Sequence, residues 1–432
     1  MRLLNARFVG SKDKLYTVSI AGGRISDIEV QSGEIQVNSD DYDVGGNLLL
    51  PGMVDMHIHS RDPGHTHKED WQTLAFACGK GGVTAVCDMP NTDPATMDMS
   101  SLQEKVKKAA NAPVNKKFYL GVGLGNIDQL NGLLSQNNHL ICGLKVYYGQ
   151  STGELMYSDL ERLAEELPNP MPGVLAFHSE DQCCIDKNQE LFGKDFCDNN
   201  ESFEVHSKVR SSEAAYASTK TILDWGYKHG IPLHIAHLST PAEVELILAA
   251  KDRGQVVTSE VAPHHLIFST KDYGKHGSYI KMNPPVRSEE EVAKLREYFG
   301  KGLIEVFATD HAPHTKEEKS EKNYARCPSG VPAIEYYTPL LLTLAEECGL
   351  SLESAVAMGA STPAKMVGFE DRGDLAVGQV ADLVVMKHEP HDVEPKDIKA
   401  KCGWSPYEGY RLNYKVAATF LEGNMVYGRE LN

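Results

Sequence analysis

Short apolar segments alternate with stretches of helical character from residue 53 to residue 309, and eight such units follow one another. The apolar segments are Met53–His57, Val83–Asp88, Phe118–Val122, Ile141–Tyr147, Val174–His178, Pro232–His237, Val256–Val261 and Ile304–Thr309. Helix candidates between them include Ser100–Ala110, Tyr157–Glu166, Ser211–Lys228, Pro241–Arg253 and Glu289–Phe299. Eight strand–helix units in roughly 320 residues predict an α/β fold of the (β/α)8 TIM-barrel type.

The two ends of the chain follow a different pattern. Residues 1 to about 50 contain β-rich runs at Leu3–Val9, Leu15–Ile20 and Arg24–Val30, separated by glycine turns. After Gly368, Asp382–Lys387 and Val416–Val426 are again strand-like. We therefore expect a catalytic barrel over residues 52–369 and a small β-sandwich domain built from residues 1–51 and 370–432.

Composition excludes several classes of protein. The net charge of −17 argues against a sequence-independent nucleic-acid binder. No apolar run reaches membrane-span length, and the N-terminal residues lack the apolar core of a secretion signal. Nine cysteines form no CxxC pair, and Cys183 is adjacent to Cys184, so a reducing cytoplasm is expected rather than a disulfide framework.

Metal-binding side chains gather where the predicted strands end, which is where barrel enzymes carry their chemistry. His57 and His59 are two apart, so on a strand they share a face, about 6–7 Å apart. A bare HxH pair is more often a solvated edge strand. Polar residues at other strand ends make a metal site the better interpretation of this pair. They are Asp88, Asn91, Lys145, His178, Glu180, His234, His237, Glu260, His264, His265, Asp310, His311 and His314.

A set of motifs in this order resembles the dihydroorotase family of the amidohydrolase superfamily, over nearly the whole chain. The motifs are HIHSRDPG at 57–64, DMPNT at 88–92, GLKVYYG at 143–149, HSED at 178–181, HIAHLST at 234–240, SEVAPHH at 259–265, KMNPPVR at 281–287, TDHAPHT at 309–315, GDLAVGQVADLVV at 373–385 and SPYEG at 405–409. Each motif alone is weak evidence, whereas the ordered set is strong.

The resemblance implies two Zn²⁺ ions per chain. One would be held by His57, His59 and Asp310, and the other by His178 and His237. Lys145 would bridge them as a carbamate, since a cationic amine cannot ligate a metal and burial lowers the pKa of lysine. Taken alone, Lys145 is better explained as a lysine whose charged end reaches solvent at a strand end.

Several histidines compete for these roles. His234 and His237 are three apart and would face opposite sides of a strand, so only one enters the barrel mouth. The motif match favours His237 and leaves His234 as a packed structural residue. Packing or ligand-supporting roles are expected for His264, His265 and Glu260, although Glu260 binds an extra metal in some relatives. His65 and His67 lie in a polar loop and are expected to be solvated.

The implied reaction is the reversible cyclisation of N-carbamoyl-L-aspartate to L-dihydroorotate in pyrimidine biosynthesis. Asp310 would take a proton from the attacking hydroxide and pass it to the leaving ring nitrogen. Arg61 is the natural forked partner of the substrate carboxylate, although it could instead form a surface ion pair with Asp62 or Glu69. By motif position, Asn91 and Asn283 bind the same carboxylate and His314 touches the ring. Thr152 and Gly153 lie on a loop that could close over the substrate.

Two alternatives stay open. Allantoinase or a hydantoinase (dihydropyrimidinase type) would share the metal site, but allantoinases tend to lack arginine at the position of Arg61. A non-catalytic amidohydrolase-like scaffold would have lost ligands, whereas every ligand position here is filled. We expect a small-molecule substrate, no nucleic-acid or membrane partner, and a homo-oligomer such as a dimer.

Overall fold

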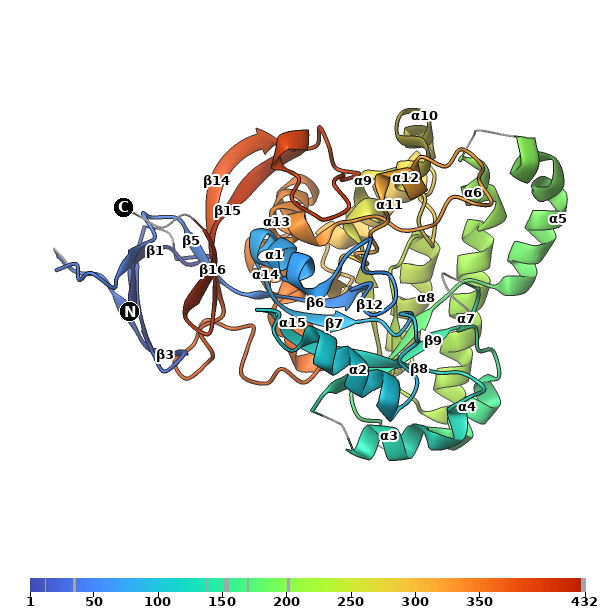
Figure 1. Cartoon of the computed structure of the whole chain (residues 1–432), viewed down its shortest axis with the longest axis horizontal. Coiled ribbons are helices and arrows are strands. Elements are labelled where there is room, and N and C mark those ends of the chain that lie inside the picture. The colour runs from blue at the N-terminus through green and yellow to red at the C-terminus, as the bar shows by residue number, and fades with distance from the viewer. Residues whose placement is uncertain are drawn as a thin grey trace.

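The computed structural model describes residues 1–11, 13–33, 36–136, 139–150, 155–168, 171–199 and 203–428. Two sheets made from the chain ends lie at one side, and a barrel surrounded by helices forms the larger part (Figure 1). No helix in the described ranges is long and apolar enough to cross a membrane.

Eight parallel strands form the barrel in the order of the sequence, from β6 to β13. They are β6 (Met53–Ile58), β7 (Val83–Asp88), β8 (Asn115–Gly121), β9 (Ile141–Tyr147), β10 (Val174–His178), β11 (Leu233–Ile235), β12 (Val257–Val261) and β13 (Val306–Phe307). A parallel bridge between Ile58 and His311 joins the first strand to the segment after the last one. The predicted barrel is therefore confirmed.

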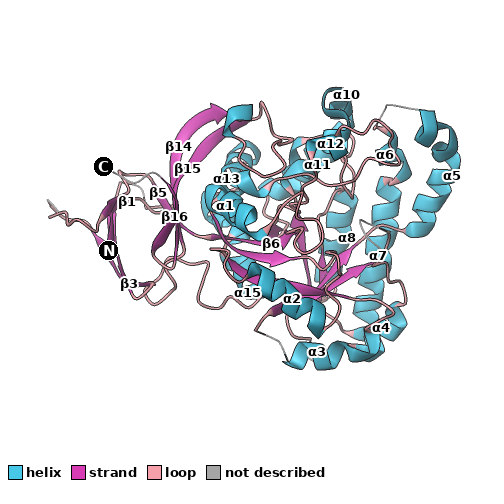
Figure 2. Cartoon of the chain, viewed as in Figure 1, coloured by secondary structure: helices cyan, strands magenta, loops and turns pink. Residues whose placement is uncertain are grey.

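Helices surround the strands (Figure 2). Local sequence determines where several of them begin: Asp70 caps α1, and Thr240 caps α8, whose first residue is Pro241. The helices are α1 (Trp71–Gly81), α2 (Met99–Ala109), α3 (Leu130–Gln136), α4 (Leu160–Glu166), α5 (Gln182–Asn199), α6 (Val205–Val209), α7 (Ser212–His229), α8 (Pro241–Asp252), α9 (Pro263–Ile267), α10 (Tyr273–His276), α11 (Glu289–Gly300), α12 (Lys316–Lys319), α13 (Tyr337–Cys348), α14 (Leu352–Gly359) and α15 (Ser361–Met366).

The two terminal sheets share one apolar core. The first contains β3 (Arg24–Val30), β2 (Tyr16–Ala21), β1 (Arg2–Ala6) and β4 (Tyr42–Asp43), and the second β16 (Asn424–Gly428), β15 (Arg411–Leu421), β14 (Leu383–Asp392) and β5 (Leu48–Pro51). Their shared core includes Leu3 and Val18 from the first sheet and Leu383 and Phe420 from the second. The β-sandwich built from both chain ends is confirmed, whereas the domain boundaries stay a prediction.

A separate apolar cluster draws on strands from all sides of the barrel and so fills its interior. Its members include Val54, Ala85, Tyr119, Ala176 and Val306. Burying these side chains away from water stabilises the interior of the barrel.

The strand predicted at Pro232–His237 is shorter than expected, since β11 ends at Ile235. His237 has a positive φ of 36°, which no extended strand contains. The alternation argument that set His234 against His237 was therefore wrong, because His237 lies beyond the strand. The predicted strand at Ile304–Thr309 is likewise reduced to Val306–Phe307, and Asp310 follows with a φ of 46°.

Candidate metal centre and active site

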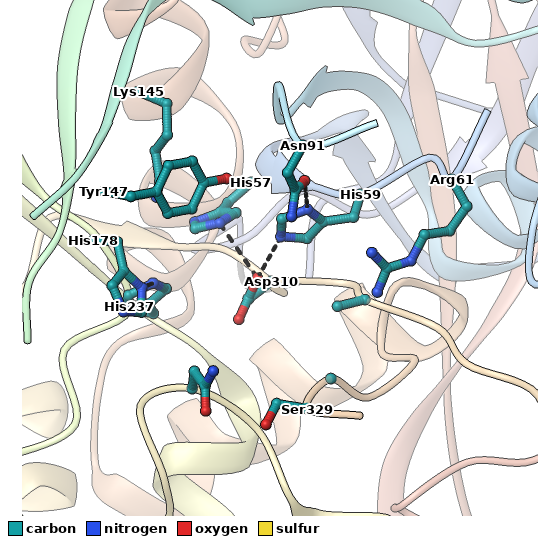
Figure 3. A pocket seen from close by; sticks show the side chains of 13 residues that line it. His57, His59, Arg61, Asn91, Lys145, Tyr147, His178, His237, Asp310 and Ser329 are labelled. Atoms are coloured by element: carbon teal, nitrogen blue, oxygen red, sulfur yellow. Dashed lines mark hydrogen bonds and ion pairs between the residues drawn. The ribbon is translucent and has the colours of Figure 1, made fainter. Parts of the chain in front are cut away.

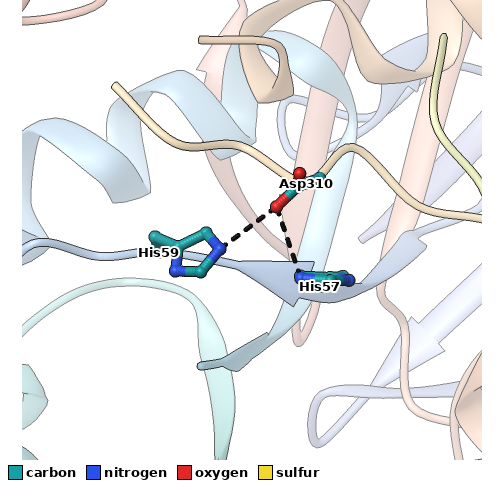
Figure 4. A group of neighbouring side chains, drawn as sticks. All are labelled: His57, His59 and Asp310. Carbon is teal, nitrogen blue, oxygen red and sulfur yellow. Dashed lines mark hydrogen bonds and ion pairs between the residues drawn. The ribbon is translucent and has the colours of Figure 1, made fainter. Parts of the chain in front are cut away.

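Three predicted ligands from opposite ends of the barrel sequence meet at one point (Figure 4). Nε2 of His57 lies 3.3 Å and Nε2 of His59 lies 3.1 Å from Oδ1 of Asp310. Potential ligand atoms of the three residues all lie within 4.8 Å of one another. The closure of β6 against the segment after β13 brings them together, so the group depends on the barrel.

Neighbouring side chains orient the two imidazoles. Nδ1 of His59 is 2.6 Å from Oδ1 of Asn91, and Nδ1 of His57 contacts Oε1 of Glu260. Because these acceptors engage Nδ1, each ring directs Nε2 toward Asp310. Glu260 also lies 3.1 Å from Nε2 of His234, which places His234 in a supporting role.

A second pair of imidazoles lies on the other side of the site. Nδ1 of His178 is 3.0 Å from Nε2 of His237. Nε2 of His178 lies 3.0 Å from Oε2 of Glu180, which also contacts Arg210. Glu180 therefore orients His178 in the way that Glu260 orients His57.

Lys145 enters the same pocket from β9 (Figure 3). Its side chain is fully buried, and its Nζ has no hydrogen-bond partner among the described residues. Burial lowers the pKa of Lys145 to about 8. An amine that is easily deprotonated and has no partner is suited to covalent modification.

The charge states of these side chains suit metal coordination. Burial lowers the pKa of His59 to about 4 and lowers the pKa values of His178 and His237. Neutral imidazoles are the form that binds a metal. Burial alone would raise the pKa of Asp310, but His57 and His59 hold it well below its usual range, so the carboxylate is ionised. His57, His59 and Asp310 thus form one group that could hold a metal ion, and His178, His237 and Lys145 line the same pocket.

The backbone is strained at this site. Five described residues other than glycine have a positive φ, and three of them, Arg61, His237 and Asp310, line the pocket. Such conformations cost roughly 1–3 kcal/mol each and persist where the surrounding structure enforces them.

Three of the four predicted substrate-binding residues, Arg61, Asn91 and Asn283, belong to the wall of the same pocket. Arg61 is only 3% exposed, its Nε donates to the carbonyl of Pro313 at 3.0 Å, and no described carboxylate forms an ion pair with it. The surface ion pair with Asp62 or Glu69 is therefore not formed. Asn283 lines the same pocket. His314 lies behind this wall, with its Nε2 3.2 Å from Nη2 of Arg61.

Some lining residues were not anticipated from the sequence. Tyr147 is two positions after Lys145 on β9 and so shares its face, a periodicity that could have revealed it. Ala312, Ser329 and Gly330 also line the pocket. No motif pointed to Ser329 or Gly330, because only the fold brings their segment against residues 312–314.

The remaining histidines lie outside the pocket lining. His265 is buried and its Nε2 is 2.9 Å from the carbonyl of Pro284, while His264 is buried without a described hydrogen-bond partner. His67 is exposed and His65 is half-buried. The loop with Thr152 and Gly153 lies outside the described residues.

Comparison with known proteins identifies the family. Residues 46–130 match a family described as dihydro-orotase-like, and residues 343–427 match the amidohydrolase family. A dihydroorotase of Halobacterium salinarum is 33% identical over 417 residues, covering 94% of each chain. One from Streptococcus thermophilus is 32% identical over 433 residues, covering 98% of each. The chain belongs to the dihydroorotase family.

Solved structures share the fold of this dihydroorotase-family chain. An L-hydantoinase (dihydropyrimidinase) from Arthrobacter aurescens superposes with a TM-score of 0.91 at 25% identity, covering 100% of this chain and 97% of the other. A dihydropyrimidinase from Brevibacillus agri gives a TM-score of 0.86 at 22% identity, covering 99% and 95%. The family resemblance expected from the motifs is confirmed, and the chain is an amidohydrolase.

Proposed function

We propose that this chain interconverts L-dihydroorotate and N-carbamoyl-L-aspartate by opening and closing the ring amide. One observation supports this most strongly: a buried arginine, Arg61, faces the same pocket as the metal-type ligands and has no described carboxylate partner. A buried guanidinium requires an anion or several acceptors. The carboxylate of dihydroorotate, which stays ionised throughout the reaction, would supply that partner.

Two Zn²⁺ ions would occupy the site, one with His57, His59 and Asp310 and the other with His178 and His237. Lys145, as a carbamate, would offer one carboxylate-like anion to both. Ions held there would polarise the amide carbonyl and lower the pKa of an attacking water molecule. The nearly complete burial of the ligands excludes bulk water from the polar groups and so strengthens their electrostatic interactions.

The residues of the chain would position the substrate and move a proton. The ionised carboxylate of Asp310 would accept the proton of the attacking water and return it to the leaving ring nitrogen. Arg61 and Asn283 would hold the substrate carboxylate. Asn91 lines the same pocket and would contribute its amide group to this binding. These contacts would place the ring carbonyl within reach of the nucleophile.

A second candidate is a hydantoinase or dihydropyrimidinase activity. The TM-score of 0.91 to the L-hydantoinase structure favours it. Simple hydantoins carry no carboxylate, so they would leave Arg61 buried without an anionic partner. That cost disfavours them. An allantoinase would meet the same difficulty, whereas a scaffold without catalysis would not need a filled ligand set.

The described cysteines are all free, which supports a reducing, cytoplasmic location. We also propose a homo-oligomer, such as a dimer, without nucleic-acid or membrane partners.

The test is a comparison of substrates on one preparation of known metal content. Purified protein should consume L-dihydroorotate and N-carbamoyl-L-aspartate, and should act far more slowly on allantoin or an unsubstituted hydantoin. Ring closure consumes a proton, so the equilibrium should move toward dihydroorotate as the pH falls. Faster hydrolysis of allantoin or hydantoin than of dihydroorotate would overturn the substrate assignment while leaving the amidohydrolase assignment intact.

A further inference from the structure

A fully buried lysine, Lys319, lies outside the metal centre. It contacts the segments around Asn283 and Ser329 that line the pocket, which we call the substrate wall. Lys319 is the last residue of α12, which begins directly after His314 and its capping residue Thr315 (Figure 1). Its side chain is 0% exposed, and no described carboxylate pairs with it. Its Nζ donates instead to three main-chain carbonyls, those of Lys281 at 3.0 Å, Pro328 at 3.0 Å and Gly330 at 3.1 Å.

These three acceptors belong to two segments that form the pocket. Lys281 stands two residues before Asn283, and Pro328 and Gly330 flank Ser329, which lines the pocket with Gly330. Lys319 itself continues the segment that contains Ala312 and His314. One ammonium group therefore ties together three wall segments, 281–283, 312–314 and 328–330.

Other contacts in the wall depend on the same alignment. Gly330 N donates to the carbonyl of Lys281 at 2.9 Å, and Ala312 N donates to that of Val331 at 2.9 Å. The carbonyl of Ser329 lies 3.1 Å from Nε2 of His314. A Cβ atom at Gly330 would lie 2.5 Å from the carbonyl oxygen of Ala312, so the two segments are in direct backbone contact.

Three carbonyl acceptors need three N–H donors, which only the protonated amine provides. Burial, together with the neighbouring cations Lys281 and Arg61, lowers the pKa of Lys319 to about 7, although Cys327 and Glu318 act in the opposite direction. Holding a charge in so dry a position costs free energy. The three hydrogen bonds offset this cost, and they fix the positions of the segments that carry the three carbonyls.

We propose that Lys319 is a positioning residue that sets the geometry of the substrate wall, and thereby substrate affinity, without touching the substrate. The expected change in substrate affinity rests on the proposed function, because it assumes that dihydroorotate is the substrate. Removing the ammonium would leave the carbonyl of Gly330 without a described donor, and the carbonyl of Lys281 would keep only the N–H of Gly330. The contact between the segments of Asn283 and Gly330 would loosen, whereas the metal ligands on β6, β9 and β10 would keep their own supports.

The experiment compares two lysine variants on zinc-loaded protein. Lys319→Met keeps the length of the side chain and removes the donor. Lys116→Met is the matched control, because the Nζ of Lys116 also donates to two carbonyls, Ala109 at 2.7 Å and Ala112 at 2.9 Å, but does so at the end of α2, away from the pocket. We expect KM for dihydroorotate to rise at least about tenfold in Lys319→Met with kcat within about threefold of wild type. The control should keep both values, and all three proteins should keep equal zinc content.

Lys319→Gln retains two of the three donors and should give an intermediate KM. An unchanged KM in Lys319→Met, or an equal change in Lys116→Met, would overturn the proposal. A loss of kcat and zinc together would also overturn it, because that result assigns Lys319 to the metal centre.

Hydrogen–deuterium exchange tests the wall without any substrate, so it distinguishes failure of this proposal from failure of the proposed function. Peptides covering 281–283 and 328–331 should be protected in the wild type and should exchange faster in the Lys319 variants only. Should neither variant fold, the wild type still decides the matter, because rapid exchange at Gly330 would show that the wall is not held as proposed.

Discussion

Asp55 on β6 and Thr309 after β13 are joined by two hydrogen bonds, although 254 residues separate them in the chain. Thr309 N donates to Oδ1 of Asp55 at 3.1 Å, and the Thr309 hydroxyl donates to Oδ2. Asp55 also accepts from the N–H of His57 at 3.2 Å. One buried carboxyl group thus holds the backbone beside two metal-type ligands, His57 and Asp310.

Replacing this carboxyl group should weaken both the fold and the metal centre. We expect Asp55→Ala to lower the free energy of unfolding by about 3 kcal/mol, because it leaves at least two buried N–H groups unpaired, and to reduce zinc retention on dialysis. Urea unfolding and metal analysis measure the two effects. The control is Asp392→Ala, which removes an exposed ion pair with Arg411 and should change stability by less than about 0.5 kcal/mol. Equal losses in the two variants would contradict this role.

Asp310→Asn should reduce turnover at least about 100-fold while the fold survives, because an amide cannot accept the proton of the attacking water. The rate is measured on dihydroorotate at saturating zinc, with circular dichroism as the check on folding. A variant that keeps more than about a tenth of the wild-type rate would place the base elsewhere.

Arg61→Met should reduce kcat/KM about 10- to 100-fold in both reaction directions, since a charge-assisted hydrogen bond contributes about 1.5–3 kcal/mol. Both substrates carry the carboxylate that Arg61 is proposed to hold. The matched control is Arg162→Met, which removes an exposed arginine paired with Asp128 and should leave both rates unchanged. Intact dihydroorotate turnover in Arg61→Met would contradict the assignment.

Lys145→Ala should lose most of its bound zinc and its activity, because the proposed carbamate is the anion that the two ions would share. Metal analysis should fall from about two ions per chain to one or fewer, and short carboxylic acids with added zinc should restore part of the activity. The wild type should show the added mass of one CO2 on Lys145. Full activity in the variant would rule out the bridging role.

The ion pair between Arg2 and Asp41 should make stability depend on acid pH. The hydrogen bond from Arg2 lowers the pKa of Asp41 to about 2, below its usual value near 4. Because the folded-state pKa is lowered, the stabilisation is present above pH 4 and is lost as the pH falls toward 2. Because the pair lies near the surface and is screened by solvent, Asp41→Asn should cost about 0.5–1 kcal/mol at pH 7 and less at pH 3. A constant difference across this range in urea unfolding would count against the pair.

Much of the fold follows from the order of residues alone. The apolar segments at Val83–Asp88, Ile141–Tyr147 and Val174–His178 have the predicted bounds, because continuous burial requires continuous apolar sequence. The pair His57 and His59 was recognisable as a candidate metal site from local sequence as well, because side chains two residues apart on an extended segment share a face.

Other features depend on contacts between distant segments. His237 could not be placed from strand periodicity, because its positive φ is imposed by its surroundings and Glu260 accepts its N–H at 3.1 Å. Lys319 belongs to a charged run of sequence, KEEK at 316–319, yet it is buried against three carbonyls. Local sequence determines where strands and helices begin and which residues can bind a metal. Only barrel closure determines which of those residues meet, because loop segments far apart in the chain have no local signal that they will share one wall.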